Sequence, residues 1–274
     1  MPENLDFTLF QPKGRLASMV QGVWSSSVAT DSPNNIERWL QSDACSGFLF
    51  NLSEPIQLND ISISTGGVLL PVSKQAQLIT LPPGAVVVGV RFHPAMSFAI
   101  LGNIYQQATL IKKPVTHNLS LETLGDQLEQ ARGHFARIVL LYRWLDTMLQ
   151  TTDIIPAPLV SALKALEGEK SPGELSSHVL LSQRQIERHF QKWLNMTPKY
   201  YQRISRVRNA LKVLKLHPET ALVDLALSIG FTDQAHMTRE FKYIARITPK
   251  HYSQKVMDDK SNVLSIKTQK SAKH

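Results

Sequence analysis

The feature that most constrains the fold is an imperfect repeat in the C-terminal part of the chain. LSSHVLLSQRQIERHFQKWLNMTPKYY begins at Leu175, and LALSIGFTDQAHMTREFKYIARITPKHY begins at Leu225. Each copy has a short amphipathic stretch, a turn that ends in a hydroxyl residue (Ser182 or Thr232), a longer amphipathic stretch and a closing Thr-Pro. Proline suits the first turn of a new helix. The repeat therefore predicts that one unit of two helices occurs twice.

The turn within each copy predicts that the unit is a helix-turn-helix. Gly230 lies in the second turn, where glycine adopts a positive φ without steric cost. The first copy has Leu180 there, which predicts a modified or strained turn. Ser182 and Thr232 each offer an oxygen to the unpaired amides of the following helix, so both are predicted as helix caps near a bound phosphate.

The second helix of each copy, expected at about 183–194 and 233–244, has one apolar and one polar face. The apolar residues recur at helical spacing, as Ile186, Phe190, Trp193 and Leu194 in one copy and Met237, Phe241 and Ile244 in the other. The predicted cap precedes the core phenylalanine by eight residues in the first copy and nine in the second. The polar faces carry side chains that hydrogen-bond base edges or phosphates: Arg184, Gln185, Glu187, Arg188, Gln191, Lys192, Gln234, Thr238 and Arg239.

Positive charge is concentrated around the repeat. The chain has 30 Lys and Arg against 22 Asp and Glu, and residues 161–274 hold 20 and 10 of these. A localised basic surface indicates a polyanionic partner such as nucleic acid, although a solvated charged face is the simpler alternative. Between the copies, residues 199–216 are predicted to form a rigid helix. Such a helix would place the recognition helices about 34 Å apart, in successive major grooves.

The N-terminal part differs in character. Residues 7–92 have the pattern of short strands separated by Gly and Pro, and Ala85–Phe92 has the β-branched content of a buried strand. Helices are expected at 96–101, 119–131 and 134–150. The last is so apolar that it must pack on its own domain or on a partner subunit. The prolines of 151–158 indicate a domain boundary.

These patterns predict an α+β protein of two domains. Residues 1–155 are expected to form a small β-barrel or sandwich with packed helices, which serves in effector binding or dimerisation. Residues 160–257 are expected to form an all-α domain with two helix-turn-helix units joined by a long helix. Residues 258–274 are expected to be a polar, basic tail.

Composition argues against several classes of function. Cys45 is the only cysteine, so no intrachain disulfide or cysteine zinc site is expected, and a core position is favoured over a redox sensor. The sequence lacks the pattern of a signal peptide and a membrane-spanning apolar stretch, so a cytoplasmic protein with no membrane partner is expected. Residues 1–160 contain His93, His117 and His134 without a His-x-His pair, which disfavours an iron enzyme. We therefore expect no catalysis, metal or cofactor.

Residues 160–255 resemble the DNA-binding domain of the AraC/XylS family of transcription regulators. The residues that carry the resemblance are Ala226, Ile229-Gly230-Phe231, Arg239-Glu240-Phe241-Lys242, Thr248-Pro249 and Tyr252 in the second copy, Leu181-Ser182, Arg184, Ile186, Arg188, Phe190-Gln191-Lys192, Thr197-Pro198 and Tyr201 in the first, and Arg206, Val207 and Ala210 between them. The resemblance implies DNA contacts from Arg184, Gln185, Glu187, Arg188, Gln234, Ala235, Thr238 and Arg239, to which we add Lys192 and Lys242. The first copy departs from the family pattern at Ser177 and Leu180.

The N-terminal part resembles more loosely a cupin-like domain that precedes this DNA-binding domain in some family members. The matching residues are Gly89–Pro94 and Leu101-Gly102. The resemblance implies effector binding or dimerisation but identifies no ligand residues. Arg91 is expected in a structural ion pair, and anion binding by Arg91 and His93 is the alternative.

The sequence thus predicts a sequence-specific transcription regulator of bacterial promoters, taken here as an activator. The expected partners are double-stranded DNA and RNA polymerase, with a small-molecule effector or a second copy of the chain acting on the N-terminal domain. Two alternatives stay open. One is an architectural protein that binds DNA without sequence preference, and the other is a cupin-type enzyme fused to a DNA-binding domain.

Overall fold

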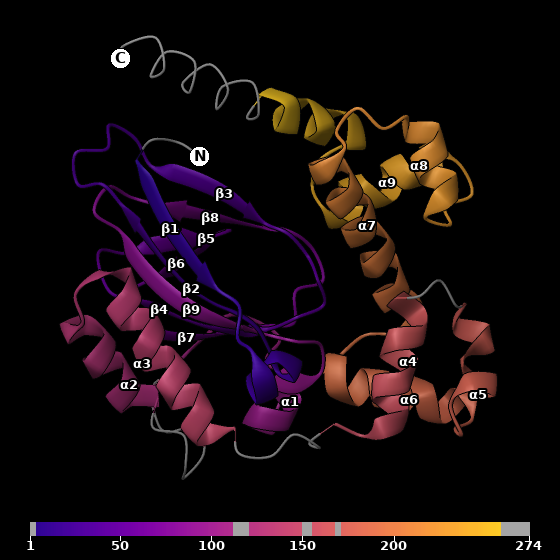
Figure 1. Ribbon diagram of the computed structural model, residues 1–274, viewed down its shortest axis with the longest axis horizontal. Helices are drawn as coiled ribbons and strands as arrows, with labels where there is room; N and C mark the ends of the chain where they lie inside the picture. Colours follow the sequence, from indigo (N-terminus) through magenta and orange to yellow (C-terminus); the bar gives the residue numbers. More distant parts are fainter. Residues whose placement is uncertain (1–3, 112–120, 150–154, 168–170, 259–274) are drawn as a thin grey trace.

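The computed structural model describes residues 4–111, 121–149, 155–167 and 171–258, which form two packed bodies (Figure 1). The N-terminal body has two antiparallel β-sheets with helices on one side, and the C-terminal body is helical. The predicted α+β fold of two domains is confirmed. Part of the predicted boundary (151–154), the start of the predicted helix at 119 and the tail from residue 259 lie outside the described residues.

Two sheets enclose the first core of the N-terminal body. The larger sheet has the order β1 (Leu5–Phe10), β2 (Val20–Val28), β9 (Val86–Phe92), β4 (Gly47–Asn51), β7 (Gly66–Leu70) and β10 (Thr109–Leu110), with the 3-10 turn Gly14–Ser18 between β1 and β2. The smaller sheet has the order β3 (Ile36–Leu40), β8 (Gln77–Leu81), β5 (Ile56–Leu58) and β6 (Ile61–Ile63). Apolar side chains from both sheets meet between them, which makes this part a small barrel-like sandwich.

The central strands β4 and β9 serve two cores, because successive side chains of a strand point to opposite faces. Leu49 and Val87 pack between the sheets. Phe48, Val88 and Val90 point the other way, into a second core beneath the helices. Burial on both faces explains the nearly continuous apolar sequence of Ala85–Phe92, which was predicted as a buried strand and forms β9.

The second core is covered by helices α1 (Met96–Leu101), α2 (Leu121–Gln130) and α3 (Gly133–Met148) (Figure 1). The apolar repeat of α3 packs on its own sheet, since Ile138, Leu141 and Leu145 are buried in this core. Phe135 is 81% exposed at the start of the same helix. The domain core therefore accounts for most of the apolar character of α3, although one aromatic ring remains outside.

The C-terminal body contains the two predicted units. Its elements are α4 (Ala157–Glu167), the 3-10 turn Pro172–Glu174, α5 (Leu175–His178), α6 (Gln183–Leu194), α7 (Pro198–Leu216), α8 (Leu222–Ser228), α9 (Gln234–Ile244) and a helix over 249–258. The pairs α5–α6 and α8–α9 lie at opposite ends of α7 (Figure 1). The helix predicted at 199–216 thus begins one residue earlier, at Pro198, where Thr197 caps it.

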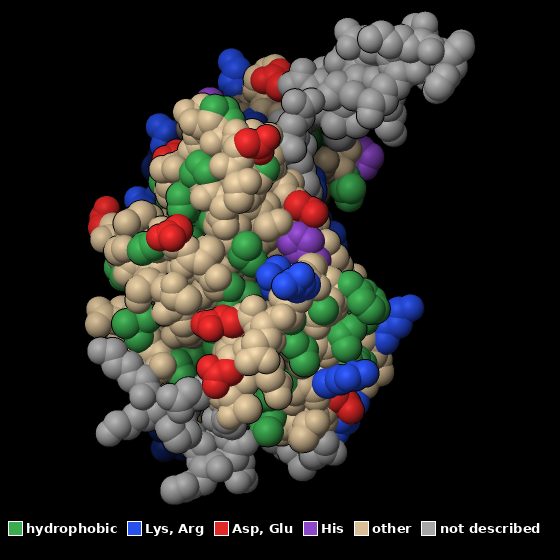
Figure 2. Space-filling view, turned by 90° about the vertical axis from the view of Figure 1, so that its left-hand side faces the viewer, with side chains coloured by type: hydrophobic (Ala, Val, Ile, Leu, Met, Phe, Trp, Pro, Cys, Tyr) green, Lys and Arg blue, Asp and Glu red, His purple; other side chains and the backbone are tan. Residues whose placement is uncertain are grey.

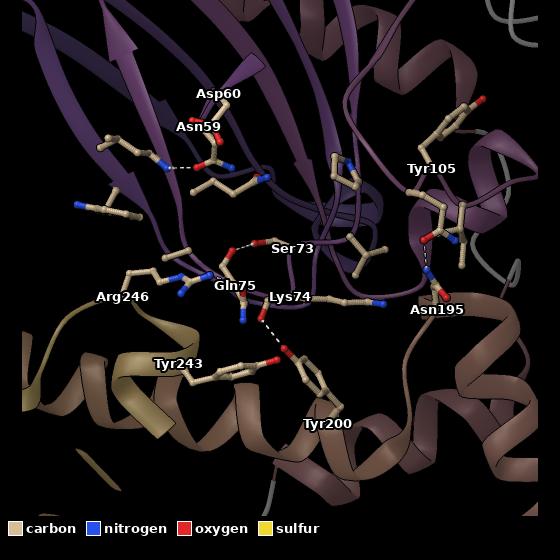
Figure 3. Close-up of a pocket in the computed structure, with 18 residues that line it drawn as sticks. Asn59, Asp60, Ser73, Lys74, Gln75, Tyr105, Asn195, Tyr200, Tyr243 and Arg246 are labelled. Carbon is tan, nitrogen blue, oxygen red and sulfur yellow. Dashed lines mark hydrogen bonds between the residues drawn. The ribbon is translucent and has the colours of Figure 1, made fainter. Parts of the chain in front are cut away.

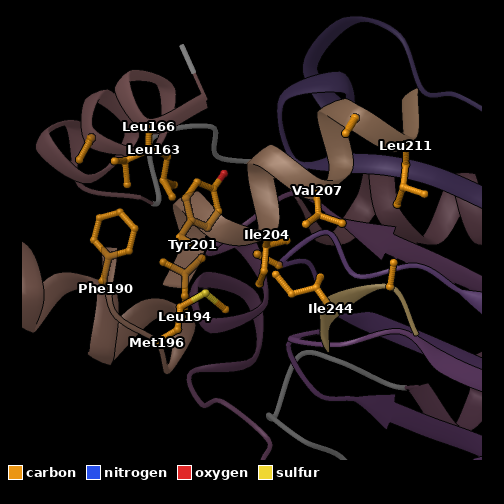
Figure 4. Close-up of a cluster of buried hydrophobic side chains, with 14 of the residues drawn as sticks. Leu163, Leu166, Phe190, Leu194, Met196, Tyr201, Ile204, Val207, Leu211 and Ile244 are labelled. Carbon is orange, nitrogen blue, oxygen red and sulfur yellow. The ribbon is translucent and has the colours of Figure 1, made fainter. Parts of the chain in front are cut away.

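One apolar core runs along α7 and joins the two units. Phe190 and Leu194 of α6 meet Tyr201 and Ile204 of α7, and Ile244 of α9 packs near Val207 (Figure 4). The core also receives Ala44 and Ala95 from the N-terminal body. The two bodies are therefore packed against each other through a shared cluster of buried side chains.

Candidate nucleic-acid interface

The first recognition helix, α6, begins at a complete capping box. The Ser182 hydroxyl accepts a hydrogen bond from the Gln185 amide at 3.3 Å, and the Gln185 side-chain oxygen accepts one from the Ser182 amide at 2.8 Å. The predicted cap at Ser182 is confirmed. Because Gln185 Oε1 is occupied in this way, only its side-chain NH2 group stays available to a base. Arg184, Glu187, Arg188, Gln191 and Lys192 are all exposed on this helix.

The second recognition helix, α9, is capped by a different residue from the one predicted. The Asp233 carboxylate accepts a hydrogen bond from the His236 amide at 2.6 Å, whereas the Thr232 hydroxyl lies 3.2 Å from the His236 ring. The prediction of a cap at Thr232 was wrong by one residue. With the cap at Asp233, Phe241 follows eight residues later, as Phe190 follows Ser182. The two units therefore match, and the extra residue lies in the turn.

The polar face of α9 carries the other predicted residues. Gln234, Ala235, Arg239 and Lys242 are exposed. Thr238 is half-buried, and its hydroxyl donates to the Gln234 carbonyl at 2.9 Å. This bond satisfies the Thr238 donor within the helix, so in this conformation its methyl group and its oxygen lone pairs remain for a base.

The two turns differ in backbone conformation. Gly230 has φ +78°, which is the left-handed conformation predicted for it. Leu180 is not among the residues with positive φ, and the chain instead leaves α5 through an extended Val179, whose carbonyl accepts from the Leu181 amide at 2.6 Å. The modified turn expected in the first unit is confirmed. It leaves the Leu180 side chain fully exposed.

A residue that the sequence did not single out braces α9 against α7. Arg203 of α7 donates two hydrogen bonds to Glu240 of α9, at 2.7 and 3.1 Å. Its guanidinium carbon lies 5.1 Å from the ring centroids of both Tyr200 and Tyr243. The hydrogen bonds to Glu240 are the main cause that raises the pKa of Arg203 above its ordinary value. This arrangement fixes the side of α9 opposite to its exposed polar face.

In the N-terminal body, Arg91 forms an ion pair with Asp43, as expected, through both Nε and Nη2. His93 Nε2 lies 3.1 Å from the Ala17 carbonyl, and burial lowers the pKa of this ring. Cys45 is buried, and burial raises the pKa of its thiol well above the ordinary value. The structure therefore confirms the structural interpretation of Arg91 and the core position of Cys45.

Among the described residues, hollows at two places are large enough to receive a small molecule. One, of 270 Å³, lies between the sheets, with largely apolar walls that include Arg38, Gln41 and Arg91. The Gln41 Oε1 atom there is buried without a hydrogen-bond partner. The other is a cleft of 860 Å³ between the two bodies, bounded by residues 71–78 and 104–106 on one side and by side chains of α7 and α9 on the other (Figure 3).

Charge and metal-binding groups are distributed as follows. On the face formed by the N-terminal body, acidic and basic side chains are interspersed, and several hydrophobic side chains gather at the lower right of the view (Figure 2). Within the described ranges, no three His, Cys, Asp or Glu side chains come together as ligands for a metal ion. No helix in the described part of the chain is long and apolar enough to cross a membrane.

The C-terminal body matches a family of known proteins. Residues 175–255 match the family described as "Helix-turn-helix domain". Residues 175–255 form a helix-turn-helix domain of the AraC type. This AraC-type domain spans both helix-turn-helix units and the connecting helix α7.

Individual proteins are similar to this chain over different parts of its length. The HTH-type transcriptional regulator ArgR of Pseudomonas aeruginosa is 28% identical over 85 residues, which are 31% of this chain and 26% of that protein. The match therefore spans about a quarter of the curated relative. A Chromobacterium violaceum regulator with an AraC-type domain is 24% identical, with a TM-score of 0.35, over 36% of this chain and 91% of its own. ToxT from Vibrio cholerae is 12% identical, with a TM-score of 0.48, over 92% of this chain and 98% of its own.

Proposed function

We propose that the protein is a sequence-specific DNA-binding transcription regulator. The observation that carries this proposal is the pair of capped helices, α6 and α9, at opposite ends of α7, each with its apolar face buried and its polar face open to solvent. A duplex presents successive major grooves about 34 Å apart on one side, and a helix fits each groove. Two such helices on one rigid support are suited to read two segments of one site.

The exposed residues divide by chemistry. Arg188 and Arg239 suit bidentate contact with guanine, and Gln234 suits adenine. Lys192 and Lys242, in the last turn of each helix, suit phosphate contact, which adds affinity without sequence preference. Arg184, Gln185, Glu187, Ala235 and Thr238 complete the proposed interface.

The test is selection from a pool of randomised duplexes with the purified full chain. A specific regulator recovers one family of sequences and prefers it over random duplex by about 10³-fold or more. An architectural protein recovers no consensus and responds strongly only to salt. Arg239→Ala, compared with the control Lys250→Ala on the following helix, should weaken the recovered site selectively.

The N-terminal body is proposed to control DNA binding through a ligand or through dimerisation. For the ligand, the cavity between the sheets favours a small, mostly apolar molecule with a hydrogen-bond donor for Gln41 Oε1. Native mass spectrometry of the purified chain tests this, with Val87→Phe as a variant that fills the cavity. An adduct that persists in this variant would place the ligand elsewhere.

For dimerisation, the outer side of α3 with Phe135 is the proposed surface. Sedimentation of the full chain should show a concentration-dependent dimer that Phe135→Ser weakens. Recruitment of RNA polymerase as an activator, a cytoplasmic location and the absence of enzyme activity belong to the same proposal. A promoter assay with purified polymerase, with and without the regulator, distinguishes activation from repression.

A further inference from the structure

The two recognition helices end in equivalent residues with the same unusual backbone. Asn195 directly follows α6, and Arg246 follows α9 after Ala245; each stands two residues before the Thr-Pro that closes its unit. Their φ angles are +53° and +57°. Glycine is the residue that most often takes this left-handed position after a helix, because it has no Cβ to clash. Asparagine is the usual alternative to glycine there, so it is the arginine at 246 that calls for a separate explanation.

Both side chains hold a glutamine of the N-terminal body. Asn195 Nδ2 donates to Gln106 Oε1 at 2.7 Å, and Arg246 Nη2 donates to Gln75 Oε1 at 2.7 Å. A glycine at either place would relax the backbone and lose the bond. The same position of the repeat thus bonds to the N-terminal body in both units, through an amide in the first unit and a guanidinium in the second.

Further contacts join the two bodies at the same points. Beside Arg246, the Ala76 amide donates to the Ile244 carbonyl at 2.7 Å. Beside Asn195, the rings of Phe98 in α1 and Trp193 in α6 lie 4.8 Å apart. The N-terminal body therefore contacts each recognition helix at its C-terminal end.

The four hydrogen-bonded side chains border one cleft (Figure 3). Gln75, Gln106, Asn195 and Arg246 all line the 860 Å³ space, and α7 forms its floor through Tyr200. The recognition helices are consequently joined twice, once through α7 and once through the N-terminal body. None of these contacts uses Arg184, Arg188, Gln234 or Arg239, which remain exposed. The N-terminal body braces the recognition helices and leaves their polar faces open.

We propose that Gln75 and Gln106 are positioning residues that fix the separation and orientation of the two recognition helices, so that the N-terminal body sets the spacing between the DNA segments that the protein accepts. This inference rests on the proposed function. When two binding units are joined rigidly, the effective concentration of the second is high at one spacing and low at others. Loosening the brace spreads that concentration over several spacings.

The first test uses the duplex recovered from the randomised pool, with base pairs inserted or removed between its two recognised segments. Wild-type protein should show a sharp optimum of spacing. The double variant Gln75→Ala/Gln106→Ala should lose about threefold to tenfold in affinity at the optimum, as expected for hydrogen bonds of ordinary net strength, and should show a flatter profile. Affinity for a duplex with one segment should stay unchanged.

Matched variants separate positioning from general damage. Gln57→Ala, exposed on β5, should behave as wild type. Gln75→Glu and Gln106→Glu keep a side-chain oxygen as acceptor and should restore the sharp profile. An unchanged profile in the double alanine variant would overturn the proposal. So would higher affinity at the optimum, because the contacts would then restrain binding.

A second measurement needs no DNA. Spin labels at Glu187→Cys in α6 and Arg239→Cys in α9, in a Cys45→Ser background, report the distribution of distances between the recognition helices. The distribution should broaden or shift in the double alanine variant and not in Gln57→Ala. Identical distributions would overturn the inference. If the wild type selects no duplex, the proposed function fails, and the label distances still decide whether the glutamines position the helices.

Discussion

Arg203→Ala should loosen the second recognition helix by an amount that the structure allows to be estimated. Glu240 is 13% exposed and Arg203 is 30% exposed, so the pair is shielded from water on its carboxylate side. Loss of hydrogen bonds to a charged group costs roughly 1.5–3 kcal/mol. Each cation–π contact with Tyr200 or Tyr243 adds about 0.5–1 kcal/mol. Because solvent reaches part of the guanidinium, we expect a total of about 2–4 kcal/mol.

Amide hydrogen exchange measured by mass spectrometry is the suitable assay, because it gives the opening free energy of the α9 peptide within the full chain. Arg203→Lys keeps the charge but lacks the planar fork, so it should recover only part of the loss. A cycle with Glu240→Gln should give a coupling energy of about 1–2 kcal/mol. If the opening free energy of α9 in Arg203→Ala lies within about 0.5 kcal/mol of wild type, the contacts of Arg203 do not stabilise α9 against α7.

Three further predictions address the caps, a base contact and Glu167, the acid at the end of α4 that bonds to α7. Ser182→Ala and Asp233→Ala should each destabilise their helix by about 1 kcal/mol in urea unfolding, whereas Thr232→Ala should cost less, and equal losses at Thr232 and Asp233 would contradict the assigned cap. Arg239→Ala should cost about 1–3 kcal/mol at the selected duplex in a binding titration, and unchanged affinity there would exclude base recognition. Burial opposes ionisation of Glu167, but its hydrogen bonds to Tyr201 and Arg208 outweigh burial and lower its pKa below 4.5. The ionised carboxylate therefore stabilises the fold above pH 4.5, and this stabilisation is lost as the pH falls through the lowered pKa. Acid unfolding should accordingly be less steep in Glu167→Gln.

The helices of the C-terminal body were predictable because amphipathic spacing and helix caps depend on residues that are close together in the sequence. α6 and α7 were predicted within one residue of their ends. The error at Thr232 arose because two adjacent residues can both cap a helix, and the unequal spacing to the core phenylalanines was the signal that favours Asp233. Leu180 was correctly predicted to depart from the glycine turn. The sequence did not indicate that an extended Val179 would make this turn without a positive φ at Leu180.

Contacts between distant residues could not be predicted in the same way. The partners of Arg203, Asn195 and Arg246 lie 37, 89 and 171 residues away, and no periodicity links them. The ion pair of Arg91 was expected, although its partner was not named. The sequence gives some indication of such a contact at Arg246, because a large side chain stands there in the position after a helix where glycine is common.

The shared apolar cluster has a practical consequence for dissection of the protein. Ala44 and Ala95 of the N-terminal body belong to the same buried cluster as the C-terminal helices. A protease that cuts the chain near residue 155 would therefore leave two fragments that stay together in gel filtration under native conditions. The helical fragment produced alone would expose the surface that these alanines cover.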